Sequence, residues 1–313
     1  MTLDPLSPAS AEAVVSRFSL SRLLDGPPYD VTPRHALALS EVLSAADAPG
    51  ASAVVLESGG QPRGLAVLRA SEWDGAHFGF PVGRLEHMIS AGPREASDLA
   101  EWVERRCADL GLRFCSTVLP AEDLHGTHAL EAAGWRYQET RLHPWLALAG
   151  AAWESSPRVR PANEADTEAV ARMARTAFSA DRFHNDPGFD AVAADAFYER
   201  WAREWFAARD PQRRAWVLEA GGTIAGFFLV RIVEPAPGAP AVADLVLTAI
   251  DTSLGRRGLG TELWSAALDA LTAEAAYCAT TISARNTAVV NLYAKLGFRF
   301  GRTETALHRW FDA

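Results

Sequence analysis

Residues 255–261 read Gly-Arg-Arg-Gly-Leu-Gly-Thr and join two apolar segments in the C-terminal half of the chain. The run 242–250 before them predicts a strand, and apolar residues at every fourth position after them predict a helix (Leu259, Leu263, Ala267, Leu271). Glycines let several N–H groups point inward, and a helix N-terminus adds partial positive charge, so this turn predicts a cradle for an anion such as a pyrophosphate. It also fits an ordinary strand-to-helix turn, and it is neither a P-loop nor a dinucleotide fingerprint.

A second pattern of candidate residues lies farther along the chain. Asn286 precedes an apolar helix that carries Tyr293 and is followed by Leu-Gly-Phe at residues 296–298. Taken alone, Asn286 fits a helix N-cap. Tyr293 alone fits a half-buried aromatic on one apolar helix stripe.

Together the two patterns resemble the GCN5-related N-acetyltransferase (GNAT) family, over residues 158–310. The resemblance implies acetyl-CoA, or another acyl-CoA, as co-substrate, with its pyrophosphate in the turn, its pantetheine arm along the preceding strand, and the Asn and Tyr near that arm. The sequence departs from the family at Gly255, where Gln or Arg is usual, so the side-chain contacts to phosphate should differ. The residues implied to bind CoA are Thr248, Ala249, Ile250, Arg256, Arg257, Gly258, Leu259, Gly260, Thr261 and Asn286.

Tyr293 has the chemistry of a general acid, because a phenol can protonate the thiolate that leaves when an amine attacks a thioester. A backbone N–H near Ile250 would polarise the thioester carbonyl. Asp244 is the nearest acidic residue on the predicted strand and the candidate general base. Strand alternation leaves open which face Asp244 occupies, so a water relay or an amine that binds already neutral is an equal alternative.

The first half repeats the order of elements in weaker form. Gly59-Gly60 and Gly221-Gly222 each separate two strand-like runs, and each half ends a helix with Gly followed by an aromatic residue. The first half lacks the glycine turn, since Pro93 removes an N–H donor, and it has Leu130 where the second half has Tyr293.

The repeat predicts an α/β fold (an α+β mixed sheet) of two tandem GNAT-like domains, the N-terminal one degenerate. A segment of small residues ending at Pro157 is the best linker. We therefore expect a degenerate domain with an N-terminal extension over residues 1–150 and a catalytic domain over 151–313. Residues 298–310 are expected to close the sheet of the second half.

Aromatic segments in both halves resemble a narrower group, the dTDP-fucosamine acetyltransferases, which acetylate an amine of a nucleotide-linked deoxysugar. They lie at residues 73–79, 178–183 and 197–201. Arg182 and Tyr198 are the candidate acceptor-binding residues, because Arg binds phosphate or carboxylate and a Tyr hydroxyl binds sugar. The other aromatic residues fit core packing equally well, and His184 fits a surface loop.

Composition limits the remaining possibilities. With 30 basic and 39 acidic residues in 313, the net charge of −9 disfavours nucleic-acid and anionic-membrane partners. Three widely spaced cysteines fit no zinc pattern, so no metal is expected. We see neither a signal-peptide pattern nor a transmembrane run, and expect a cytoplasmic monomer or homodimer.

The sequence thus predicts an acyl-CoA-dependent N-acyltransferase that acts on a small-molecule amine, such as an amino sugar, by direct attack. Two alternatives stay open. One is a tandem acetyltransferase similar to mycothiol synthase. The other is a non-catalytic CoA-binding or sensing protein.

Overall fold

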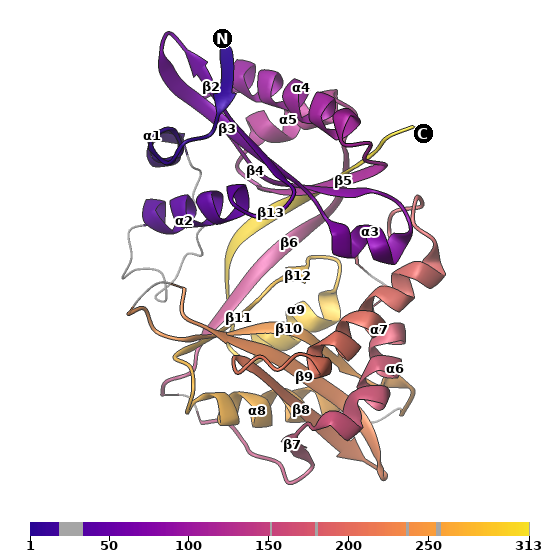
Figure 1. The fold of residues 1–313 in the computed structure, drawn as a ribbon. Helices are drawn as coiled ribbons and strands as arrows, with labels where there is room; N and C mark the ends of the chain where they lie inside the picture. The colour runs from indigo at the N-terminus through magenta and orange to yellow at the C-terminus, as the bar shows by residue number, and fades with distance from the viewer. Residues whose placement is uncertain (19–33, 151, 179–180, 236–237, 255–257, 313) are drawn as a thin grey trace. The chain divides into compact units, whose positions relative to one another are not determined.

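A computed structural model describes residues 1–18, 34–150, 152–178, 181–235, 238–254 and 258–312. The chain has the predicted mixed α/β fold, with helices packed on β-sheets (Figure 1). It divides into two compact units. Of the described chain, unit 1 holds residues 1–141 and 302–312, and unit 2 holds residues 142–301. The assignment of separate roles to residues 1–150 and 151–313 stays a prediction.

In unit 1 the strand order is β1-β2-β3-β4-β5-β13, with β4 and β5 parallel and the other neighbours antiparallel. The strands are β1 (Thr2–Pro5), β2 (Ala51–Ser58), β3 (Gln61–Ala70), β4 (Val82–Ser90), β5 (Phe114–Pro120) and β13 (Arg299–Trp310). The helices are α1 (Pro8–Phe18), α2 (Arg34–Ala46), α3 (Glu72–Phe78), α4 (Pro93–Asp109) and α5 (Leu124–Ala132).

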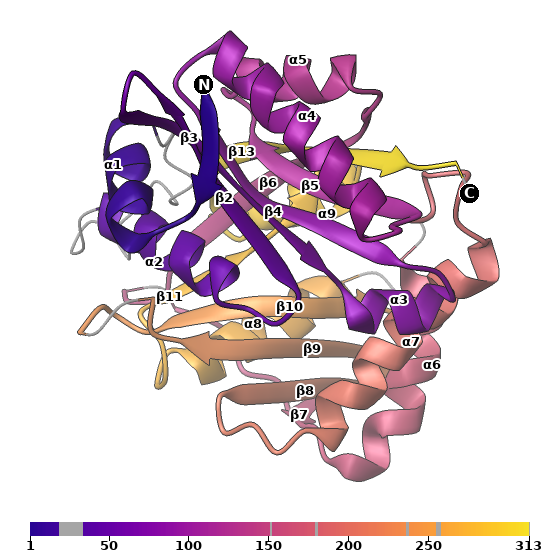
Figure 2. The ribbon, with the colours of Figure 1, turned by 45° about the horizontal axis from the view of Figure 1, so that its top comes forward.

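In unit 2 the order is β6-β11-β10-β9-β8-β7, and β12 pairs with β6. Strand β6 belongs to this unit from Leu142 onward, and β13 belongs to unit 1 from Arg302 onward. Figure 2 shows β8, β9 and β10 side by side. The strands are β6 (Arg136–Ala147), β7 (Val159–Pro161), β8 (Arg213–Ala220), β9 (Thr223–Val233), β10 (Val242–Ile250), β11 (Tyr277–Thr280) and β12 (Ile282–Ser283). The helices are η2 (Glu164–Asp166), α6 (Thr167–Ala177), α7 (Ala191–Ala207), η3 (Thr252–Leu254), α8 (Leu259–Leu271) and α9 (Thr287–Lys295).

The predicted repeat is present residue by residue in the two sheets. In each unit four residue pairs join two parallel strands, and the last pair is Leu85–Thr117 in unit 1 and Leu245–Thr280 in unit 2. At each last pair the Thr hydroxyl donates to the Leu carbonyl, at 2.8 Å in unit 1 and 3.1 Å in unit 2. A register shift follows Leu245 in β10, and one follows Leu85 at the same place in β4. The two units therefore share one construction.

The expectation for residues 298–310 is wrong in one respect. Strand β13 pairs antiparallel with β5 of unit 1, and Leu307 is buried in the unit 1 core. The end of β6, from the first half of the sequence, pairs with β11 in unit 2. The two halves have exchanged their last strands. Apolar alternation predicts that such a segment is a strand but does not specify which sheet edge it joins.

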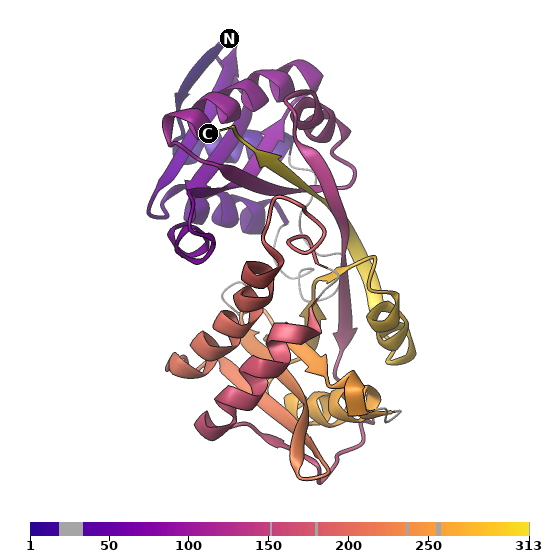
Figure 3. The ribbon, with the colours of Figure 1, turned by 90° about the vertical axis from the view of Figure 1, so that its right-hand side faces the viewer.

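The sheet of unit 2 is covered differently on its two faces. Ala243, Leu245 and Cys278 point into a core built with α8 and α9. Helices α6 and α7 pack together on the other side of the strands, as Figure 3 shows. Val242 and Ala279 belong to a separate small cluster with Trp145. Along β10, odd-numbered side chains up to Leu245 thus face α8 and α9, and even-numbered ones face the opposite side.

The close packing at the end of β10 makes a prediction about folding stability. A Cβ at Gly226 of β9 would lie 2.4 Å from Ile250 Cδ1 and 3.1 Å from the Ala249 carbonyl oxygen. We expect Gly226→Ala to lower the free energy of unfolding by about 1–3 kcal/mol, because the strand cannot move away from its neighbour. Gly260→Ala is the control, since its Cβ would meet nothing closer than 3.8 Å. Urea unfolding of both variants checks this, and equal stabilities would contradict it.

Candidate active site

The candidate site begins where β10 and β11 separate. Their parallel pairing ends at Leu245 and Thr280, where the Thr280 side chain bonds to the strand. Beyond that pair β10 continues alongside β9 as far as Ile250, whereas β12 pairs with β6. Among the described strands, none but β9 pairs with residues 246–250, and we call their other backbone edge the open edge.

Backbone donors face this open edge. The N–H of Asp251 donates to the Ala225 carbonyl on the β9 side, and residues of an antiparallel strand alternate between its two edges. Thr248 and Ile250 therefore direct their peptide groups to the open edge, while Ala249 directs its own to β9. The Thr248 hydroxyl is already used, because it donates to the Phe227 carbonyl at 2.8 Å. The open edge thus offers the backbone of Thr248 and Ile250.

The turn after β10 leads into the N-terminus of α8. Gly258 is the N-cap, with φ of 89°, in the left-handed region that favours glycine. The N–H groups of Leu259, Gly260 and Thr261 are the first three of the helix, so they have no acceptor within it and lie at its positive end. The Leu259 side chain is buried in the core, which leaves its backbone for a ligand. Arg256 and Arg257 lie outside the described residues.

Tyr293 lies beneath the point of strand separation and is 2% exposed. Its ring packs against Trp264 and Phe298, with centroids 5.0 and 4.9 Å away. Thr280, the residue that closes the last β10–β11 pair, lies near its hydroxyl. Burial, and to a smaller extent Cys278, raises the pKa of Tyr293, although Thr280 acts to lower it. The phenol is therefore protonated at neutral pH.

Asn286 is the N-cap of α9. Its Oδ1 accepts a 3.2 Å hydrogen bond from the Val289 N–H. The cap uses only the acceptor side of the amide, so the NH₂ group keeps its capacity to donate. A structural and a ligand-binding role are compatible at this residue.

Asp244 lies on the face of β10 opposite to Tyr293, because it alternates with Ala243 and Leu245 of the core. The side chain is exposed and makes no hydrogen bond or ion pair with any residue that the structure describes. Protein surrounds it on its other sides, and this desolvation raises the pKa of Asp244 to about 6, although Arg231 acts to lower it. Asp244 is thus a solvent-accessible carboxylate that titrates near neutral pH.

The candidate acceptor residues belong to α7 and the loop before it. Tyr198 is 9% exposed and stacks on Phe178 at 4.5 Å, and the Arg182 guanidinium lies 4.9 Å from the Phe183 ring centre. Tyr198 is therefore packed among aromatic rings, and Arg182 is the more accessible of the two.

His184, expected as a surface loop residue, is held by two carboxylates. Its ring nitrogens contact Asp181 at 2.7 Å and Asp195 at 2.9 Å. Burial acts to lower the pKa of His184, but the two carboxylates outweigh it and raise the pKa. The sequence pattern does not predict this contact, because Asp195 lies 11 residues further along the chain, in α7.

The sequence did not predict roles for Thr280 and Gly226. Thr280 lies at the last β10–β11 pair. Gly226 has no side chain, which lets Ile250 pack closely against β9. The recurrence of Thr117 and Gly64 at the same register positions of unit 1 is the signal that could have found them. Unit 2 alone brings together the backbone of Thr248 and Ile250, the start of α8, and Tyr293.

Comparison with known proteins agrees with this geometry. Residues 176–298 match the acetyltransferase (GNAT) family. Among curated proteins, a spore coat polysaccharide biosynthesis protein, SpsD of Bacillus subtilis (strain 168), is 28% identical over 93 residues, 29% of this chain. The match spans 32% of the length of that relative.

Solved GNAT structures share the fold of the whole chain. A tandem GNAT protein from the clavulanic acid biosynthesis pathway matches with a TM-score of 0.54 and 16% identity, covering 99% of this chain and 98% of its own. A GCN5-related N-acetyltransferase from Sphaerobacter thermophilus matches with a TM-score of 0.59 and 13% identity, covering 99% and 95%. These likenesses show the fold, including its tandem GNAT-like architecture.

Two features are absent from the described residues. No helix there is both long and apolar enough to span a membrane. No cluster of three or more His, Cys, Asp or Glu residues suited to a metal ion was found in the same part of the chain.

The raised pKa of Asp244 predicts how stability depends on pH. Between pH 3.8, the ordinary pKa, and about 6, the folded chain holds a proton that the unfolded chain has released, so this group lowers stability as pH rises through that range. We expect Asp244→Asn to melt at a higher temperature than the parent protein at pH 7.5, with no such gain at pH 3.5. Asp4→Asn, at an exposed position on β1, is the control. A gain that is the same at both pH values would contradict the assignment.

Proposed function

We propose that this protein is an acyl-CoA-dependent N-acyltransferase, with acetyl-CoA as donor and a small-molecule amine as acceptor. The observation that carries the proposal is the separation of β10 from β11 directly above a buried, protonated Tyr293. The GNAT match over residues 176–298 includes this region.

The start of α8 supplies the donors suited to a pyrophosphate. The N–H groups of Leu259, Gly260 and Thr261 point out of the helix N-terminus, and we propose that Arg256 and Arg257 add positive charge there. The open edge at Thr248 and Ile250 gives an extended, amide-containing arm a strand to pair with. In this proposal the NH₂ of Asn286 bonds the same arm, and the Ile250 N–H polarises the thioester carbonyl.

The proposed reaction divides proton transfer between two side chains. Asp244 accepts a proton from the ammonium form of the acceptor, which frees the nitrogen lone pair for attack on the thioester carbon. When the tetrahedral adduct collapses, the C–S bond breaks, and Tyr293 donates its proton to the departing thiolate. The amide nitrogen loses its second proton to solvent, from which Tyr293 is reprotonated. A water relay to Asp244 satisfies the same proton balance.

Several observations favour an amino sugar as the acceptor. The relative that matches in sequence is a polysaccharide biosynthesis protein, and the aromatic segments resemble the dTDP-fucosamine acetyltransferases. Arg182 and Tyr198 remain the proposed residues for the rest of the sugar and its phosphate. Amines of other tandem acetyltransferases, including a cysteinyl amine of the mycothiol type, belong in the same substrate panel.

Acetyl-CoA binding is the first test. At about 100 times its dissociation constant a ligand adds roughly 2.7 kcal/mol to the free energy of unfolding, so acetyl-CoA should raise the melting temperature visibly. N-acetylcysteamine thioacetate, which has the thioester but no pyrophosphate, should produce little shift. Thiol release with nucleotide-linked amino sugars and other amines then identifies the acceptor. A shift with no turnover on any amine would support a CoA-sensing protein, and no shift would contradict the proposal.

Tyr293→Phe tests the chemical step. The ring packing is preserved and only the proton donor is lost, so kcat should fall by about 10²–10⁴-fold with the affinity for acetyl-CoA nearly unchanged. Leu130→Phe changes the corresponding position of unit 1 and should leave kcat alone if it folds normally. The kcat is measured by thiol release at saturating acetyl-CoA. A kcat of Tyr293→Phe within threefold of the parent enzyme would contradict the role of Tyr293 as general acid.

A further inference from the structure

We propose that His184, held between Asp181 and Asp195, is a proton-dependent latch that fixes the loop of residues 181–189 to α7 and opens when the imidazole ring loses one proton. We call these three side chains the His184 latch. The latch itself does not depend on any reaction. One consequence rests on the proposed function: the loop carries Arg182, so the latch would regulate a proposed acceptor-binding residue.

The latch joins two segments of the chain through one imidazole ring. The Nδ1 atom of His184 lies 2.7 Å from Asp181 Oδ2, and its Nε2 atom lies 2.9 Å from Asp195 Oδ1. An ionised carboxylate only accepts hydrogen bonds, and a neutral imidazole has a single N–H. Both contacts are therefore hydrogen bonds only when the ring carries two protons. In the neutral ring, one nitrogen lone pair would face a carboxylate oxygen at hydrogen-bond distance.

The loop side of the latch is held by its own hydrogen bonds. Asp181 Oδ1 accepts from the backbone N–H groups of Phe183 and His184, at 2.7 and 3.1 Å. The Asp181 carbonyl accepts from the backbone and the side-chain amide of Asn185. The Asp181 side chain therefore cannot turn away from the ring without breaking other bonds of the loop. On the other side, the backbone of Asp195 is held by α7.

The surroundings of His184 favour the charged ring. The loop presents Asp181 to it, and α7 presents Asp195 and the ring of Tyr198, which stacks on the imidazole at 6.5 Å. Burial lowers the pKa of His184, but Asp195 and Asp181 raise it by more, so the pKa lies above its ordinary value. The stabilisation by the latch is thus complete below the pKa of the unfolded chain, and it is lost as pH rises through the pKa of the folded chain.

Apolar contacts keep the loop attached to α7 when the latch opens. Phe183 is 5% exposed, and its ring centre lies 4.8 Å from that of Phe197 in α7 and 5.1 Å from that of Phe189. These contacts have no proton to lose. Arg182 and His184 flank this anchor in sequence. Opening of the latch therefore loosens the chain on either side of Phe183 while the protein stays folded.

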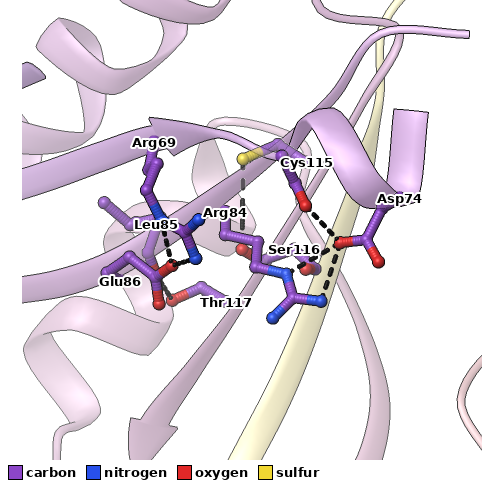
Figure 4. Close-up of polar contacts among 9 residues, drawn as sticks. Arg69, Asp74, Arg84, Leu85, Glu86, Cys115, Ser116 and Thr117 are labelled. Carbon is purple, nitrogen blue, oxygen red and sulfur yellow. Dashed lines mark hydrogen bonds and ion pairs between the residues drawn. The ribbon is translucent and has the colours of Figure 1, made fainter. Parts of the chain in front are cut away.

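The ion pairs in Figure 4 use arginine instead of histidine. Figure 4 shows Arg84 bonded through two nitrogens to Asp74 of α3, at 2.9 and 2.7 Å, and Arg69 bonded to Glu86. Arginine stays charged in proteins, whereas histidine changes its charge near neutral pH. Helix α3 is thus a reference for the loop, because it is a short segment whose carboxylate binds a cation that does not titrate.

The first test is NMR of the imidazole ring. The full chain, which has eight histidines, is labelled with ¹⁵N-histidine, and the His184 signals are those lost in His184→Gln. We expect both ring nitrogens to carry a proton at pH 6, and the titration midpoint to lie above the ordinary pKa of 6.5. Asp195→Asn should lower that midpoint, and Glu204→Gln, on the same helix, should not. A midpoint at or below 6.5, or one that Asp195→Asn leaves unchanged, would overturn the proposal.

Hydrogen exchange tests whether the ring holds the loop. Amide protection factors of residues 181–189, corrected for the intrinsic exchange rate, are measured at pH 5.5 and 8.5. We expect protection to be lower at pH 8.5 by about threefold or more, with no such loss in His184→Gln or in residues 72–78 of α3. Equal protection at both pH values, or a loss that persists in His184→Gln, would overturn the latch. Neither experiment uses CoA or an amine, so failure of the acyltransferase proposal is distinct and would appear as no CoA binding or no thiol release.

Discussion

One hydrogen bond organises the candidate site. The Thr280 hydroxyl donates to the Leu245 carbonyl at the last pair of two parallel strands. Past this rung the strands need not stay together, and the backbone of β10 is free along one edge. Tyr293 lies close to Thr280, so the candidate proton donor and the open edge meet at a single residue.

The duplicated unit shows which parts of this arrangement belong to the fold and which to chemistry. Unit 1 keeps the threonine rung at Thr117, so strand separation is a property of the architecture. It has a buried leucine, Leu130, in place of the phenol, and an ion-paired arginine, Arg84, in place of the open carboxylate. Within the described chain, neither the phenol nor the open carboxylate of unit 2 has a counterpart at this place in unit 1.

Local patterns were sufficient to predict some elements but not others. Strand β10 and helix α9 were predicted closely, because apolar periodicity and caps are local signals. Strand β6 was not predicted. It contains Pro144 and buries the polar residues Glu139 and His143, and none of the three is typical of a strand interior. Alternation alone could not decide which face of the sheet carries the Asp244 side chain. The structure decides it, because the neighbouring Ala243 is in the core. The partner of β13 depended on contacts distant in sequence.

The exchange of last strands has a consequence for how the chain folds as it is synthesised. The described part of unit 2 lies within residues 142–301, so it is synthesised before residues 302–310 of β13. Strand β5 of unit 1 must wait for β13, at the other end of the polypeptide, and until then presents an unpaired edge of backbone donors and acceptors. The first unit to emerge from the ribosome is thus the last to be completed. Loss of residues 302–312 would leave β5 of unit 1 without this partner.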